Sequence, residues 1–200
     1  MIDMQLREVK ELIISAIVIA LAYSIASLGG IKSFFIIKNL FITFISSLLV
    51  VSLGFVLHEL GHRSTARKFG CYAEYRMWPQ GLLLAMLFSF LGFLFAAPGA
   101  VVIHPRVDLW GRIMTITRKK AGIIAISGPI TNFILSLFFY LVYVFYPLNL
   151  FYAGAYINAF LGVFNLIPFP PFDGQKVFVW DRKIWLLSLV FGLFILFIIL

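Results

Sequence analysis

Long unbroken runs of apolar residues alternate with short charged clusters along this chain. A helix needs roughly 17 to 25 apolar residues to cross the hydrocarbon core of a bilayer. Five of the runs reach about this length, and we expect each of them to form a membrane-crossing helix. They cover residues 12–28, 39–62, 123–146, 150–168 and 184–200.

A sixth run, residues 81–103, is equally apolar but makes the topology inconsistent if it crosses the membrane once. If the N-terminus is cytosolic, the second crossing ends in the basic cluster 63–68, and the third begins after the basic cluster 118–120. Both clusters belong on the cytosolic side, so 81–103 should enter and leave by one face. Of the 16 Lys and Arg, only Lys32 and Lys38 then lie outside. An ordinary sixth membrane helix is the alternative.

The region around this run, residues 72–122, differs from the rest of the chain. Residues 74–78 alternate polar and apolar side chains, and residues 113–117 are rich in β-branched ones, so both are typical of strands. Proline and glycine punctuate the region. We predict a small cytosolic-side β-sheet with a re-entrant hairpin between its strands. The free edge of the strand at 74–78 could also pair with an extended peptide from another protein.

Composition supports a membrane protein. The chain is 62% hydrophobic and only 12% charged, whereas soluble domains have about 25% charged residues. We therefore expect an all-α polytopic membrane protein with five to six transmembrane helices. Residues 1–200 would form a single intramembrane domain, with core spans 39–62, 123–146 and 150–168 and the insert 72–122.

The net charge of +8 would suggest nucleic acid binding in a soluble protein. Here the basic residues border apolar segments, where they act as topology signals. The predicted partner is thus the lipid bilayer rather than nucleic acid. We expect a multi-pass protein of the cell membrane with a cytosolic N-terminus.

The second predicted crossing ends in His58-Glu59-Leu60-Gly61-His62, in a chain with only three histidines. Residues four apart share a helix face, so His58 and His62 can hold one ion about 2 Å from each imidazole. Glu59 would then take a proton from water bound to that ion. Burying these groups in hydrocarbon costs several kcal/mol unless they are paired or bound to metal. The motif therefore predicts a zinc site within the membrane, toward its cytosolic side.

A catalytic zinc ion usually has three protein ligands, so a third must come from elsewhere. Asp173 follows a proline-rich stretch just beyond the fourth predicted crossing, and Gly174 allows a tight turn that could aim the carboxylate back into the bundle. His104 is the other candidate. An isolated histidine beside a proline is more often a loop residue, so we favour Asp173.

A hydrolytic reaction at such a metal site would also need hydrogen-bond donors for the oxyanion of its tetrahedral intermediate. Asn165, eight residues before Asp173, is the first candidate, and Asn132 is the second. Each offers a side-chain amide donor. Hydrogen bonding between membrane helices is the alternative role for both asparagines.

Three motifs in this order resemble the site-2 proteases, the intramembrane zinc metalloproteases of peptidase family M50. The motifs are His58-Glu59-Leu60-Gly61-His62, Gly128-Pro129 with Asn132, and Asn165 with Pro168 and Asp173-Gly174. The resemblance covers roughly residues 39–62 and 123–175. One departure is Gln175, where many relatives have a second glycine.

The resemblance implies that His58, His62 and Asp173 bind one zinc ion per chain and that Glu59 is the catalytic base. The implied reaction is cleavage of peptide bonds within membrane protein substrates. The sequence also leaves three alternatives open: a membrane metal transporter, an inactive relative that only binds membrane helices, and a prenyl-protein endopeptidase. The last would need a downstream glutamate ligand, but no glutamate follows Glu74.

Overall fold

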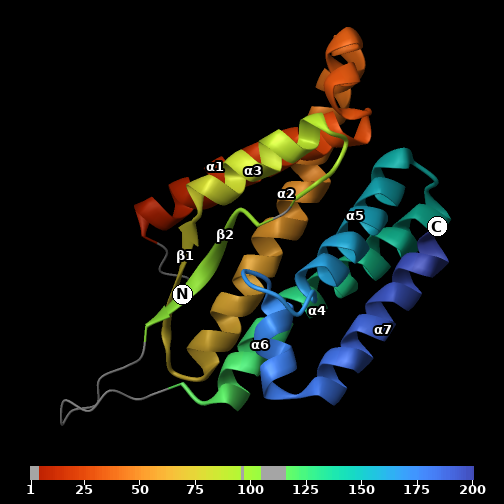
Figure 1. Cartoon of the computed structure of the whole chain (residues 1–200). Helices are drawn as coiled ribbons and strands as arrows, with labels where there is room; N and C mark the ends of the chain where they lie inside the picture. The colour runs from red at the N-terminus through yellow and green to blue at the C-terminus, as the bar shows by residue number, and fades with distance from the viewer. Residues whose placement is uncertain (1–4, 96, 105–115) are drawn as a thin grey trace. The chain divides into compact units, whose positions relative to one another are not determined.

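The computed structural model of the chain describes residues 5–95, 97–104 and 116–200. These residues form mostly helices, together with a two-stranded sheet (Figure 1). The chain divides into two compact units. The first unit comprises Met1–Val56 with Tyr75–Ala100, and the second comprises Leu57–Glu74 with Val101–Leu200.

The first unit is built around α1 (Leu6–Ser27), which packs against α3 (Pro79–Phe90) (Figure 1). Between them in sequence come the short 3-10 helix η1 (Gly30–Phe35) and the beginning of α2 (Ile37–Lys68). Proline at the first position of α3 suits a helix start, because the N–H that it lacks would have no partner there.

The strand β1 (Tyr72–Met77) pairs with β2 (Gly99–His104). The N–H of Trp78, just after β1, donates to the carbonyl of Pro98, just before β2, at 2.8 Å, so the strands are antiparallel. β1 confirms the strand predicted at 74–78.

Within the described residues, the strand that pairs with β1 is not the one that we predicted. We expected it at 113–117, of which residues 113–115 lie outside the described part of the chain. The observed partner, β2, lies instead within the apolar run 81–103. Its sequence contains Val101, Val102 and Ile103, which favour strands. In an unbroken apolar run, periodicity alone does not separate such a strand from a buried helix.

Acidic side chains of α1 cover the other edge of β1 within the first unit. Glu8 accepts a hydrogen bond from the N–H of Tyr75 at 3.1 Å, and Glu11 accepts one from the N–H of Met77 at 2.9 Å. The Tyr75 hydroxyl also donates to Ser15 Oγ at 2.8 Å. These N–H groups already have partners, so the structure does not favour the predicted pairing of a substrate with this edge.

Four helices in the described residues are long and apolar enough to cross a membrane. They are α1, α2, α4 (Arg118–Phe145) and α7 (Arg182–Ile199). The crossing predicted at 150–168 corresponds to α5 (Asn149–Asn165), which has 17 residues and is not among these four. With only 12 residues, α3 is about 18 Å long, and the apolar run continues into the strand β2, so residues 81–103 do not form one continuous helix.

In the second unit, α4 packs against α5 and α6 (Asp173–Trp180), and α5 packs against α7 (Figure 1). Phe133 of α4 is buried where α4, α5 and α7 meet. A side chain at Gly162 or Gly192 would collide with its ring, so these glycines allow the three helices to approach closely. The N-terminus of α4 is capped by Thr117, whose hydroxyl accepts from the N–H of Lys120 at 3.3 Å.

Large apolar side chains are exposed along the outer faces of α4 and α7. Leu187 and Phe197 of α7, for example, are 70% and 77% exposed. Contiguous apolar surface of this kind is rare on soluble monomers and is what a lipid environment covers. The four apolar helices and these faces fit a multi-pass membrane protein.

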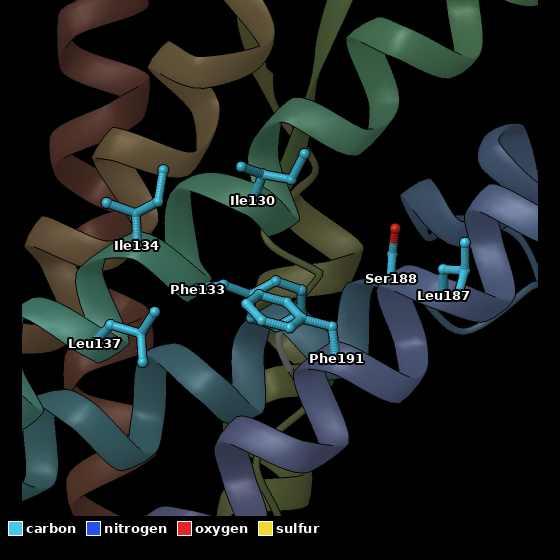
Figure 2. A pocket seen from close by; sticks show the side chains of 7 residues that line it. All are labelled: Ile130, Phe133, Ile134, Leu137, Leu187, Ser188 and Phe191. Carbon is cyan, nitrogen blue, oxygen red and sulfur yellow. The ribbon is translucent and has the colours of Figure 1, made fainter.

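An apolar groove lies between α4 and α7 on this surface (Figure 2). Its lining residues are Ile130, Phe133, Ile134, Leu137, Leu187, Ser188 and Phe191.

Candidate metal centre

The two histidines of the sequence motif lie side by side on the part of α2 that belongs to the second unit. His58 and His62 are both buried, and their ring centroids are 4.6 Å apart. Helical spacing of four residues places the rings on one face, as predicted. Their Nε2 atoms face each other at 3.0 Å.

Asp173, the first residue of α6, joins the two histidines. Its Oδ2 atom lies 2.9 Å from His62 Nε2 and 3.2 Å from His58 Nε2. The Asp173 side chain is 14% exposed. The structure therefore brings together the three residues that the sequence suggested as a ligand set.

The chain before Asp173 must turn sharply after α5. A side chain at Gly174 would collide with the carbonyl groups of Leu166 and Ile167, so only glycine fits there. The indole N–H of Trp185 on α7 donates to the Leu166 carbonyl at 2.7 Å. The close approach of the chain at Gly174 and the hydrogen bond from Trp185 together stabilise the turn that carries Asp173.

The hydrogen bond that each imidazole makes through Nδ1, away from Asp173, shows that this nitrogen carries a proton. Nδ1 of His58 donates to Oδ1 of Asn132, and Nδ1 of His62 donates to the Ile124 carbonyl at 2.7 Å. A carbonyl oxygen only accepts, so each Nδ1 carries a proton, and in the neutral imidazole each Nε2 then presents its lone pair. Three lone pairs, two from imidazoles and one from a carboxylate, thus converge. Their mutual repulsion favours a cation among them.

A zinc ion fits this donor set. Zinc binds imidazole nitrogen and carboxylate oxygen at about 2.0 to 2.2 Å, which in a tetrahedral site separates the donors by roughly 3.3 Å. The observed separations of 2.9 to 3.2 Å are slightly shorter. Three protein donors would leave a fourth position open on such an ion, as in catalytic zinc sites.

The ionisation of Asp173 also suits metal binding. Its Oδ2 atom lies within 3.2 Å of two imidazole nitrogens, and a cation bound among these donors would favour the ionised form of the carboxyl group. The side chain would then be a carboxylate, which is the form that coordinates metal.

Gly128 of α4 makes room for the two imidazoles. A Cβ atom built at this position would lie 2.6 Å from His58 Nε2 and closer still to Nε2 and Cε1 of His62. The close approach of α4 to the histidines thus requires glycine here, within the Gly128-Pro129 motif.

Glu59 lies between the histidines in sequence and is also buried. Its Oε2 atom has no hydrogen-bond partner within the described residues. A buried carboxylate oxygen without a partner is costly, so such groups concentrate at sites that bind ligands or do chemistry. Glu59 is available to accept a proton there.

His104, the alternative third ligand, lies elsewhere in the second unit. Its Nε2 atom is 3.3 Å from Oε1 of Glu74, and its ring lies against Tyr72. Within the described residues, the group of potential metal ligands consists of His58, His62 and Asp173. The preference for Asp173 over His104 thus agrees with the geometry.

The two candidate oxyanion donors already make hydrogen bonds. Nδ2 of Asn165 donates to the Leu161 carbonyl of its own helix at 3.0 Å. Asn132 is fully buried, with its oxygen on His58 and its Nδ2 on Oδ1 of Asn158 at 3.0 Å. The oxyanion role of both stays a prediction, and the contacts of Asn132 favour the alternative of helix–helix hydrogen bonding. Sequence reasoning missed Asn158, although a polar residue within an apolar run was the signal.

The residues of α4 that line the apolar groove (Figure 2) differ from those that contact the histidines. Gly128 and Asn132 contact the histidines, whereas Ile130 and Ile134 line the groove. A step of two residues turns a helix by about 200°. The groove is therefore separate from the candidate metal centre.

Comparison with known proteins agrees with this site. The sequence model of peptidase family M50 matches residues 46–148 and 147–180. The protein MJ0611 of Methanocaldococcus jannaschii, provisionally named a zinc metalloprotease, is 39% identical over 185 residues, covering 90% of this chain and 87% of that protein. The zinc metalloprotease MJ0392 of the same organism is 31% identical over 127 residues, or 61% of this chain and 30% of that protein. No solved structure matches the chain significantly.

The chain therefore belongs to peptidase family M50. The family match includes all three motifs that carried the resemblance. It confirms the expectation of a metalloprotease, with zinc as the metal that the donor set fits.

Proposed function

We propose that this protein is an intramembrane zinc protease that hydrolyses peptide bonds within or near the transmembrane segments of other membrane proteins. The observation that carries the proposal is the convergence of His58 Nε2, His62 Nε2 and Asp173 Oδ2 within 3.2 Å of one another, beside a buried glutamate. The names of the two relatives support the metal and the reaction class.

His58, His62 and Asp173 would hold the zinc ion through these three atoms, one ion per chain. When bound, zinc polarises the carbonyl of a peptide bond and lowers the pKa of a bound water molecule toward 7. The hydrogen bonds to Asn132 and to the Ile124 carbonyl keep both imidazoles in the orientation that presents Nε2. Ligand orientation of this kind raises metal affinity.

Glu59 would act as the general base. It follows His58 directly on α2, and its buried Oε2 has no partner in the described residues, so it can accept a proton from the attacking water. It can then pass the proton to the leaving amine. Asn165 and Asn132 are proposed to assist the oxyanion only if their amides are released from their present partners.

The membrane orientation is also part of the proposal. We place the N-terminus and the basic clusters 63–68 and 118–120 on the cytosolic side. His58 is ten residues, or about 15 Å of helix, before Lys68, so the site would lie inside the bilayer but nearer the cytosol. α5, at the lower length limit for crossing, would be a fifth span, and the segment 81–103 would enter and leave by one face. A cysteine placed at Ser89 should react with impermeant reagents from the cytosolic side or from neither, and external labelling would contradict this topology.

The decisive experiment compares metal content with cleavage in the purified full chain. Glu59→Gln removes the base but no ligand, so about one zinc per chain should remain while cleavage of a membrane-spanning substrate falls by 10²-fold or more. His58→Ala and Asp173→Ala should lose both metal and activity.

Each alternative has its own outcome in this experiment. A metal transporter would cleave nothing as wild type and would still move zinc after Glu59→Gln. An inactive helix-binding relative would bind substrate without cutting it. Full zinc content in Asp173→Ala would show that the third ligand is wrong.

A further inference from the structure

We propose that Asn158 on α5 is a positioning residue for the metal centre, acting through Asn132 on the tautomer of His58. The inference rests on the proposed zinc site. It concerns a row of hydrogen bonds that runs from α5 through α4 to α2, all within the second unit.

The row begins at the carbonyl oxygen of Gly154, which can only accept. Nδ2 of Asn158 donates to it at 2.8 Å, and this leaves Oδ1 of Asn158 facing α4. That oxygen accepts from Nδ2 of Asn132 at 3.0 Å, so the oxygen of Asn132 must face His58. His58 Nδ1 then has to be the donor.

The direction of this row matters because an asparagine amide is nearly symmetric in shape. Its oxygen and nitrogen can exchange places, and only the hydrogen-bond partners decide between the two orientations. Asn132 and Asn158 are both fully buried, so water is not available to satisfy a reversed amide. The carbonyl at one end of the row therefore favours one orientation for each amide up to the histidine.

Reversal of Asn132 would turn its NH₂ group toward His58 Nδ1. The ring would have to accept there, and its proton would move to Nε2, the atom that faces His62 and Asp173. A protonated Nε2 has no lone pair for a metal ion. Asn158 thus helps to keep His58 in its metal-binding form without touching the site itself.

Zinc affinity of the detergent-solubilised full chain tests this inference directly. Removing partners that orient metal ligands typically weakens metal binding 10- to 100-fold. Asn158→Leu removes the acceptor for Asn132 at similar volume, and we expect zinc, titrated against a chromophoric chelator, to bind about 10-fold more weakly. Asn158→Asp keeps an acceptor toward Asn132 and should bind zinc more tightly than the leucine variant, even if it is less stable. Equal weakening by both substitutions would show that Asn158 acts only through packing.

A matched control lies on the same pair of helices. Ser136 of α4 is buried and donates to the Ala155 carbonyl of α5 at 2.8 Å, outside the row. Ser136→Ala should lower stability without changing zinc affinity. If the leucine variant does not fold, Asn158→Ala replaces it in the comparison with the aspartate variant.

A double-variant cycle shows whether the effect passes through Asn132. In the Asn132→Ala background, Asn158→Leu should cause less than a twofold further loss of zinc affinity, because the connection is already broken. A further 10-fold loss in that background would overturn the inference.

Failure of the inference is distinguishable from failure of the proposed function. A wild-type chain that binds no zinc contradicts the proposed function itself. A wild-type chain that binds zinc and cleaves substrate, with unchanged affinity in Asn158→Leu, contradicts only the role of Asn158. Replacement of zinc by cobalt gives a second readout, since the visible absorption of bound cobalt should change in Asn158→Leu and not in Ser136→Ala.

Discussion

Replacing Gly128 by alanine adds one methyl group at the closest approach of α4 to the metal centre. The new Cβ would lie 2.6 Å from His58 Nε2 and closer to the ring of His62, where ordinary van der Waals contact needs at least 3.4 Å. The Nδ1 atoms of the two imidazoles are hydrogen-bonded to Asn132 and to the Ile124 carbonyl. The rings therefore cannot move away from the new methyl group without losing those hydrogen bonds.

Two effects on stability oppose each other in Gly128→Ala. Alanine favours a helix over glycine by about 1 kcal/mol. Overpacking of a well-filled site costs typically 1 to 3 kcal/mol. The net loss in the free energy of unfolding of the metal-free protein should therefore be small, about 0 to 2 kcal/mol.

The effect on zinc binding should be larger. Displacement of both Nε2 atoms by several tenths of an ångström disturbs two of three ligands and their supporting hydrogen bonds together. Since loss of one supporting contact costs 10- to 100-fold in affinity, we expect at least a 100-fold weaker zinc affinity, or about 2.8 kcal/mol.

Zinc titration and thermal unfolding of the metal-free protein separate these effects. Gly192→Ala on α7 is the matched control, because its Cβ would collide with the Phe133 ring rather than with a histidine. It should lose stability of similar size and keep its zinc affinity. Wild-type zinc affinity in Gly128→Ala, with a folded protein, would refute the geometry proposed for the site.

Three further outcomes are expected. Removal of zinc by a chelator should lower the melting temperature, and zinc at 100 times its Kd should restore about 2.7 kcal/mol of stability; a melting temperature insensitive to zinc would contradict binding to the folded state. His104→Ala should keep full zinc content and lose less than about 1 kcal/mol, because the histidine side chain is 49% exposed where it meets Glu74; loss of zinc would make His104 a ligand. Trp185→Phe should cost about 1 to 3 kcal/mol by leaving the Leu166 carbonyl without its donor, measured by denaturant unfolding, and an unchanged stability would show that this contact does not hold the turn.

Helix positions followed from sequence because the physical constraint is simple. A membrane crossing needs a long apolar run, and the runs at 12–28, 39–62, 123–146 and 184–200 lie within or largely overlap the four apolar helices. The strand β2 did not follow, since its residues continue an apolar run that begins in α3. Its identity depends on pairing with β1, a contact that no local pattern reveals.

The set of metal ligands could also be predicted from the sequence, for a chemical reason. His58 and His62 are related by helix geometry, and a zinc ion with two such ligands requires a third donor. A chain with few polar residues in its apolar segments offers few choices, and Asp173 was the acidic residue beside a glycine and a proline-rich turn. Scarcity of polar groups thus made a long-range contact predictable.

The partners behind the ligands could not be predicted in the same way. The sequence shows Asn132 as a polar residue within an apolar run, but whether its amide faces a substrate oxyanion or an imidazole depends on how α4 is rotated against α2 and α5. The structure places its two ends on His58 and Asn158, residues 74 and 26 positions away. In hydrocarbon each such group needs a partner, and sequence shows this need without showing the partner. The register of helix packing makes that choice, so it also decides which asparagines can orient a ligand and which remain available to the reaction.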